Sequence, residues 1–201
     1  MINERLKLKG TVHLCVRGAD GLVKEDRTIE NLVVNAGLAY IISRMVGTAK
    51  PAISHMALGA GTTAAASAQT DLIAMLGARE ALDSTTITGT NNEKVVYVAS
   101  FEAGDATGAV TEAGLFNAAT GGDMLCRTVF AVVNKAADDT MTVTWTITVS
   151  AVNDAPVAVA NTYAATEDTL LSGKNIITDD DNGATAGGVD YDVEGQALTL
   201  S

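Results

Sequence analysis

The chain has 201 residues, enough for one or two domains, and 47% of them are hydrophobic, so it can bury a substantial core. Only 4% are aromatic, which means that Val, Ile, Leu and Ala must fill most of that core. The formal net charge is −11, which argues against the basic surface that nucleic-acid binding needs. The sequence contains no run of about 18 apolar residues, so it gives no sign of a membrane-spanning helix.

The N-terminal residues alternate between apolar and polar side chains, as strands with one buried face do. This alternation covers residues 6–17 and resumes over 23–34. The two runs are separated by a break that contains Asp20-Gly21, a dipeptide favoured in hairpin turns. The pattern therefore predicts a β-hairpin.

Two helical segments are predicted next. Apolar residues at helical spacing predict a helix over 36–46, with Asn35 as its N-cap and Gly47 directly after its end. A short strand over 53–58 leads into a glycine-containing loop. A second small helix is predicted over about 68–77, where leucine and isoleucine residues would share one face.

From residue 81 onward the pattern is that of strands, and the last one is the clearest. Residues 140–150 place Met, Val, Trp, Ile and Val on one face and Thr and Ser on the other. The expected fold is mainly β: an antiparallel β-sandwich of roughly seven to nine strands with two short α-helices, ending near residue 150. The strands expected in this half cover 85–90, 94–102, 110–117, 124–133 and 140–150.

The composition changes at residue 151. Residues 1–150 carry 15 acidic and 12 basic residues, whereas 151–201 carry nine acidic residues and one basic residue. The segment 151–156 ends in proline and has the character of a linker. We therefore expect a β-sandwich domain over 1–150, and over 151–201 a linker followed by the beginning of a second domain.

The acidic C-terminal segment holds the chain's best candidates for metal ligands. Calcium takes six to eight oxygen ligands, several of them from carboxylates on irregular backbone. Asn153, Asp154, Asp190 and Asp192 are the candidate calcium ligands, and the last two lie on the same side of an extended chain. The alternative is a solvated acidic loop. No other cofactor is expected.

The cysteines and histidines give no recognisable catalytic or zinc motif. Cys15 and Cys126 lie far apart in apolar runs, which favours two reduced, buried thiols over a disulfide or a reactive thiol. His13 and His55 lie in predicted strands with no local triad partners, which favours structural roles.

Two further motifs favour structure over chemistry. The Gly59-Ala-Gly61 loop lacks the lysine of a phosphate-binding loop, so a turn that needs glycine is expected. Glu102, Asp105 and Glu112 could in principle supply paired carboxylates for glycoside hydrolysis. Because carbohydrate sites also present aromatic platforms and the single Trp lies mid-strand, we expect the chain not to be an enzyme.

An ordered set of segments stands out within residues 31–150. The set comprises 31–38, 55–63, 111–117, 125–130 and the Thr-rich final strand, and its glutamate–glycine–leucine–phenylalanine stretch is the most specific part. In this order the segments resemble a family of phage tail-fibre or tail-collar-like structural proteins. The resemblance implies a virion structural role and transfers no catalytic residues.

A second set of segments lies in the acidic part of the chain: Val152–Pro156, Ala164–Thr169 and the Asp-rich stretch that follows. With these segments, residues 151–201 resemble the start of a cadherin-like or bacterial Ig-like repeat. Many such repeats form stalks and bind calcium at domain junctions, and Asn153-Asp154 and Asp190/Asp192 match those ligand positions. An insertion-like segment at 182–188 departs from the pattern.

Together these observations predict a bacteriophage virion protein, assembled in the host bacterial cytoplasm. It would be a tail, baseplate or neck fibre component that docks on other virion proteins and projects an Ig-like arm, with host-surface contact by that arm as a further role. A homo-oligomer is expected, with a trimer favoured because fibres are usually symmetric. The alternatives are a capsid decoration protein (a cement or head-fibre protein) and, third, a bacterial surface adhesin.

Overall fold

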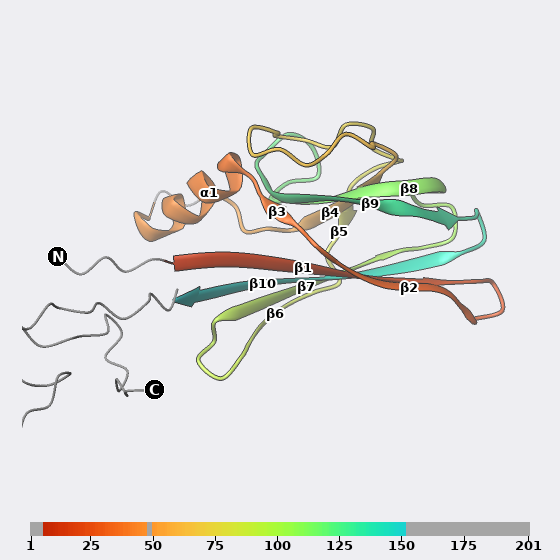
Figure 1. Ribbon diagram of the computed structural model, residues 1–201, viewed down its shortest axis with the longest axis horizontal. Helices are drawn as coiled ribbons and strands as arrows, with labels where there is room; N and C mark the ends of the chain where they lie inside the picture. Colours follow the sequence, from red (N-terminus) through yellow and green to blue (C-terminus); the bar gives the residue numbers. More distant parts are fainter. Residues whose placement is uncertain (1–5, 48–49, 152–201) are drawn as a thin grey trace, which may run out of the picture. The chain divides into compact units, whose positions relative to one another are not determined.

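The computed structural model describes residues 6–47 and 50–151, and within them Leu8–Ser150 form one compact unit. The described residues hold ten strands and one helix, arranged as two facing antiparallel sheets (Figure 1). The elements are β1 Leu6–Arg17, β2 Val23–Glu30, β3 Leu32–Val33, α1 Asn35–Met45, β4 His55–Gly59, β5 Glu80–Ala81, β6 Ser84–Thr88, β7 Lys94–Phe101, β8 Gly108–Phe116, β9 Met124–Lys135 and β10 Thr140–Ala151.

The first sheet has the strand order β2-β1-β10-β7-β6 and the second has the order β3-β9-β8-β4-β5. The mainly β antiparallel sandwich predicted from the sequence is therefore confirmed. The strand number exceeds the prediction because β3 and β5, each two residues long, are too short to show any periodicity.

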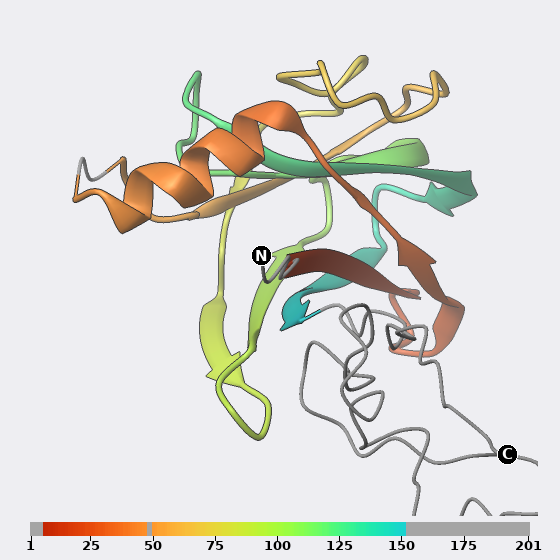
Figure 2. The ribbon, with the colours of Figure 1, turned by 60° about the vertical axis from the view of Figure 1, so that its left-hand side comes forward.

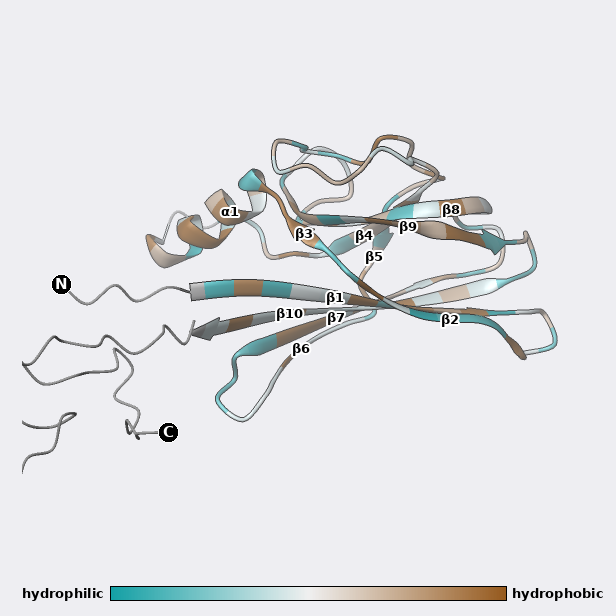
Figure 3. Ribbon diagram, in the orientation of Figure 1, coloured by the Kyte–Doolittle hydropathy of each residue, from teal (hydrophilic) through white to brown (hydrophobic). Residues whose placement is uncertain are grey.

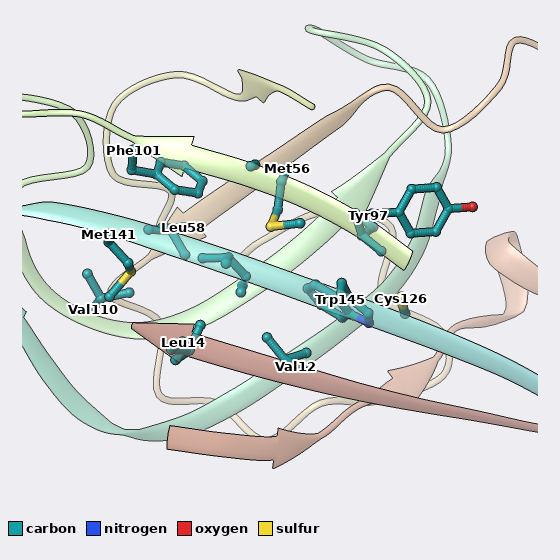
Figure 4. Close-up of a cluster of buried hydrophobic side chains, with 14 of the residues drawn as sticks. Val12, Leu14, Met56, Leu58, Tyr97, Phe101, Val110, Cys126, Met141 and Trp145 are labelled. Carbon is teal, nitrogen blue, oxygen red and sulfur yellow. The ribbon is translucent and has the colours of Figure 1, made fainter. Parts of the chain in front are cut away.

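The core follows from the alternation along β10. Met141, Val143, Trp145 and Ile147 are all buried, and only Val149, at the end of the strand, is 39% exposed. Figure 4 shows this face meeting side chains from β1, β4 and β7, so the core is filled by both sheets. The alternating threonines of β10 lie on the opposite face of the first sheet.

The predicted strand over 23–34 is broken at Asn31, where the chain passes from the first sheet to the second. The Asn31 amide donates a hydrogen bond to the Gly10 carbonyl over 3.2 Å, and the Trp145 indole N–H donates to Asn31 Oδ1 over 3.1 Å. A Cβ at Gly10 would lie 1.6 Å from that Oδ1, so glycine is required there. These contacts join distant parts of the chain and fix Asn31 as the point where the chain crosses from the first sheet to the second.

The predicted helix over 36–46 is confirmed to within one residue as α1, which packs against β9 (Figure 2). Val34, rather than Asn35, is the N-cap, and it makes no side-chain cap hydrogen bond. Gly47 follows the helix with φ +72°, as the C-terminal glycine was expected to do. At Gly37 the backbone of α1 lies directly against β9, because a Cβ there would be 2.0 Å from the Leu125 carbonyl oxygen.

The second helix predicted over 68–77 is not confirmed. These residues belong to an irregular loop over 60–79, with a single β-bridge between Gly59 and Met75. Leu72 is buried, but Ile73 is 53% exposed, so the apolar face inferred from spacing does not form. The amides of Ile73 and Ala74 donate to a buried carboxylate instead of to carbonyls one turn earlier.

Ala151, predicted to begin the linker, is the last residue of β10, and the rest of the predicted linker and the Ig-like segment lie outside the described residues. The same holds for the four candidate calcium ligands Asn153, Asp154, Asp190 and Asp192. Those predictions stay predictions.

Candidate functional site

The most densely connected polar site in the described residues is an ion pair between Glu112 on β8 and Arg127 on β9. Both side chains have no exposed surface. Arg127 donates to Glu112 Oε2 through Nη2 over 2.7 Å and through Nε over 2.9 Å. The pair lies on the face of the second sheet that points away from the sandwich core, beneath residues 60–79. We call the pair the loop anchor and residues 60–79 the anchored loop.

The Glu112 carboxylate binds both arms of the anchored loop. Its Oε1 accepts the amides of Gly61 over 3.0 Å and Ala74 over 2.7 Å, and its Oε2 accepts the amide of Ile73 over 3.1 Å. A Cβ at Gly59 or Gly61 would lie 2.6 or 2.4 Å from Oε1. The glycines of this motif therefore allow the backbone to approach a carboxylate. The expected turn that needs glycine is not the reason for them, because neither has a positive φ.

Arg127 holds the first arm of the anchored loop from the other side. Its Nη1 donates to Gln69 Oε1 over 2.8 Å, and its Nη2 donates to the Thr63 carbonyl over 3.0 Å. Gln69 Oε1 in turn accepts the Ala66 amide over 2.9 Å. A planar guanidinium with several fixed donors suits this branched arrangement.

The electrostatics of the loop anchor keep Glu112 ionised. Burial raises the pKa of its carboxyl, but the hydrogen bonds from the Ala74 and Ile73 amides and from Arg127 outweigh burial, so its pKa lies below the ordinary value of 4.5. An enclosed carboxylate that stays ionised and uses both oxygens on its own chain has no free position for a substrate. The arrangement fixes a loop on the second sheet.

The three carboxylates considered for glycoside hydrolysis lie at different kinds of site. Glu112 is in the loop anchor, whereas Glu102 and Asp105 lie in the turn after β7, where Asp105 Oδ2 accepts the Glu102 amide over 3.2 Å. The Glu102 carbonyl also accepts the Lys135 ammonium over 2.8 Å. In the part of the chain that the structure describes, the hydrogen bonds of Glu112 go to the anchored loop and to Arg127 and not to the other two residues, so the structure gives this pairing no support.

A second buried charged cluster lies where β9 turns into β10. Asp139 and Lys135 are each 1% exposed. Asp139 accepts the Lys24 ammonium over 2.5 Å and the Ala136 amide over 3.0 Å, and the Lys24 hydrogen bond is the main cause that lowers the pKa of Asp139. Burial lowers the pKa of Lys135, against the opposing effect of nearby carboxylates. The cluster ties this turn to the β1–β2 hairpin and to the turn after β7.

The histidines occupy partly exposed positions. His13 Nε2 lies 3.0 Å from Asp26 Oδ1 on the outer face of the first sheet. His55 Nδ1 lies 2.8 Å from Ser54 Oγ, its neighbour in sequence. Within residues 6–47 and 50–151, His55 meets no carboxylate that could orient it as the base of a triad.

Both cysteines are free thiols, as expected, but they differ in burial. Cys126 is fully buried in the core, and burial raises the pKa of its thiol well above the ordinary value. Cys15 is only partly buried, so the expectation of two buried thiols holds for Cys126 alone.

A groove of about 430 Å³ lies beside the loop anchor, at the β2–β3 crossover. Its charged groups already have partners, since Glu30 is paired with Lys9 at 2.8 Å and Arg127 is enclosed by the anchored loop. The Nδ2 of Asn31 is a buried donor without a partner among the described residues. The lining consists of Glu30, Asn31, Leu32, Thr62, Ala64, Ala65, Arg127, Thr128 and Val129.

Comparisons of the chain with protein families, with curated proteins and with solved structures find no match. Among the described residues, no three His, Cys, Asp or Glu side chains gather as a metal site would require. Within the same residues, no helix has the length and apolar character needed to cross a membrane.

Sequence reasoning missed the loop anchor, although its signal is visible afterwards. Glu112 is the one charged residue of β8, and Arg127 lies within β9, whose other charged residue, Lys135, is its last. Charges inside such strands are almost never buried unless they are paired. One acid and one base of this kind, on strands adjacent in sequence, would have predicted a buried ion pair.

Proposed function

We propose that this chain is a structural protein of a bacteriophage virion, a tail, baseplate or neck fibre component that docks on other virion proteins. The proposal rests on where the segments that resemble phage tail proteins lie in the fold. Residues 55–63, 111–117 and 125–130 meet at the loop anchor, where they fix a surface loop on a rigid sheet. A module specified by such contacts suits assembly rather than turnover of a substrate.

The chain is further proposed to work as a homo-oligomer, with a trimer favoured, and to use residues 151–201 as an Ig-like arm that can reach the host surface. The arm is proposed to bind calcium through Asn153, Asp154, Asp190 and Asp192. Titration calorimetry of the full chain should show heat with calcium, and Asp190→Asn should remove it. If neither the full chain nor a chain extended past residue 201 releases or absorbs heat with calcium, the calcium proposal is wrong.

The location is tested by immunogold electron microscopy of purified phage particles with antibody against the full chain. Gold at the tail, baseplate or neck supports the proposal. Gold spread over the capsid shell would replace it with a capsid decoration protein. Label on bacterial cells, with none on particles, would instead indicate a surface adhesin.

Incubation of the purified protein with host polysaccharide tests the non-enzymatic assignment. The expected result is no increase in reducing ends. New reducing ends would make the chain a depolymerase.

A further inference from the structure

The first sheet ends at β6, which forms its lower border in Figure 1. In the part of the chain that the structure describes, β6 pairs with β7 on one side and with no strand on the other. Five consecutive residue pairs, from Ser84 with Val98 to Thr88 with Lys94, fix it to β7. Its outer side therefore presents a row of backbone N–H and C=O groups, for which an extended chain supplies the matching partners. We call residues 84–88 the β6 edge.

The other sheet edges in the described residues are protected against such pairing. β2 carries five charged residues among its eight, and Figure 3 shows hydrophilic colour along it. β3 and β5, at the edges of the second sheet, are each two residues long. Charged side chains and very short strands both prevent an edge from accepting a further strand. The β6 edge has five exposed residues and carries neither charge nor proline, so it lacks these protections.

The register shows which side chains a further strand would meet. Ile87 pairs with Val95, and Val95 pairs with Ile147, which is 4% exposed in the core. Ile87 therefore lies on the inward face of the first sheet, although it is 67% exposed. Thr85 lies on the same face, and the other three residues of the β6 edge lie on the outward face. A strand that pairs here should place apolar residues beside Thr85 and Ile87 and polar residues at the alternate positions.

Two charges at the ends of the β6 edge select the partner and its direction. Asp83 directly precedes the edge, and Lys94 is paired with Thr88 at the other end. Both charged residues are exposed, and among the described residues neither forms a salt bridge. An antiparallel strand that begins with an acidic residue near Lys94 and ends with a basic residue opposite Asp83 complements both charges. A second copy's β6, paired about a two-fold axis through the middle of the strand, would place a serine and a glycine there and supply neither charge.

We infer that the β6 edge docks an extended segment of another protein as an added antiparallel strand. The segment carries two apolar residues on its inward face, an acidic residue at its start and a basic residue at the other end, opposite Asp83. The inference rests on the docking with other proteins proposed above, and it names the surface and the chemistry of the partner. Main-chain hydrogen bonds supply the affinity of such pairing, and the edge is short, so a six-residue peptide should half-saturate it on the order of hundreds of micromolar.

A peptide titration of the full chain, followed by proton–nitrogen NMR, tests the docking. The probe is acetyl-Glu-Val-Thr-Val-Thr-Lys-amide, which meets each requirement when it lies antiparallel to β6. It should shift the amide signals of the β6 edge and leave those of β2 unchanged. Its reversed sequence, acetyl-Lys-Thr-Val-Thr-Val-Glu-amide, has the same composition but brings the two charges to the right ends only as a parallel strand. The reversed peptide should bind at least roughly fivefold more weakly.

Single substitutions separate the β6 edge from other exposed apolar surface. Ile87→Lys places a charge on the inward face beside the peptide, as protected natural edges do, and should weaken binding at least roughly tenfold. Ile42→Lys is the matched control, because Ile42 is an isoleucine on α1 that is 59% exposed, and it should leave binding unchanged. Asp83→Asn should weaken binding roughly two- to fivefold at low salt and should have no effect at about 1 M salt. Unchanged thermal unfolding of each variant shows that the fold is intact.

The outcomes that overturn the inference can be told apart. If millimolar probe leaves the β6 signals unchanged, or shifts those of β2 or the anchored loop instead, the β6 edge is not the docking surface. If the β6 signals of the free protein move with its concentration and sedimentation shows dimers, a second copy occupies the edge and the inferred partner is wrong. Equal binding of the two peptides would refute the antiparallel direction. None of these results bears on the virion location, which the immunogold experiment decides separately.

Discussion

Removal of one charge from the loop anchor, by Glu112→Gln, should release the anchored loop. In the variant, the amide nitrogen must replace one carboxylate oxygen. At Oε1 it would face the donors of Gly61 and Ala74, and at Oε2 it would face those of Ile73 and Arg127. Either orientation leaves at least two buried donors without an acceptor.

The magnitude follows from those lost bonds. Each buried donor left unsatisfied costs roughly 1–3 kcal/mol, and breaking a buried ion pair by removing one partner costs about 3–5 kcal/mol. We therefore expect the free energy of unfolding to fall by about 3–5 kcal/mol and the melting temperature by roughly 10 °C. Glu102→Gln, the same chemical change on an exposed side chain, should alter stability by less than about 0.5 kcal/mol.

The assay uses Trp145, the single tryptophan, as a buried reporter of the sandwich during urea unfolding. Hydrogen exchange by mass spectrometry should show faster exchange over residues 60–79 in the variant. Because the pKa of Glu112 in the folded protein lies below 4.5, its contribution is complete above that value and is lost as the pH falls through the folded pKa. The gap between wild type and variant should therefore narrow below pH 4.5. A variant within about 0.5 kcal/mol of wild type at pH 7, or a gap independent of pH, would refute this reasoning.

Three further outcomes are expected. Gly37→Ala should cost about 1–3 kcal/mol and speed hydrogen exchange in α1, since the new methyl group would meet the Leu125 carbonyl; unchanged exchange would contradict the packing described. Asp139→Asn should lower the urea midpoint at pH 7, and because the folded pKa of Asp139 is depressed, that difference should shrink as the pH falls below 3.8; a constant difference would argue against an ionic role. Iodoacetamide should modify Cys15 in the native protein and Cys126 only after unfolding; early modification of the second thiol would disprove its burial.

How much of the fold could be predicted depended on how local its cause was. The alternation of β10 and the helical spacing around α1 are set by side chains within a few residues of one another, and both were predicted nearly to the residue. The anchored loop was mistaken for a helix because Leu72 and Leu76 have helical spacing. Its backbone donors are bound instead by Glu112, about 40 residues later in the chain.

By itself, the sequence determined the β class, the antiparallel sandwich and the position of α1, since these follow from periodicity and from which faces must be buried. It also predicted a second helix over 68–77, which does not form. Only the tertiary structure decided where the chain changes sheets, which glycines must lie against Asn31 or Glu112, and that the isolated charges of β8 and β9 form one buried pair. Those features depend on contacts between residues far apart in the chain. The local pattern marks Glu112 as a lone acid that needs a base, but folding alone selects Arg127 as its partner and brings Gly10 and Trp145 to Asn31.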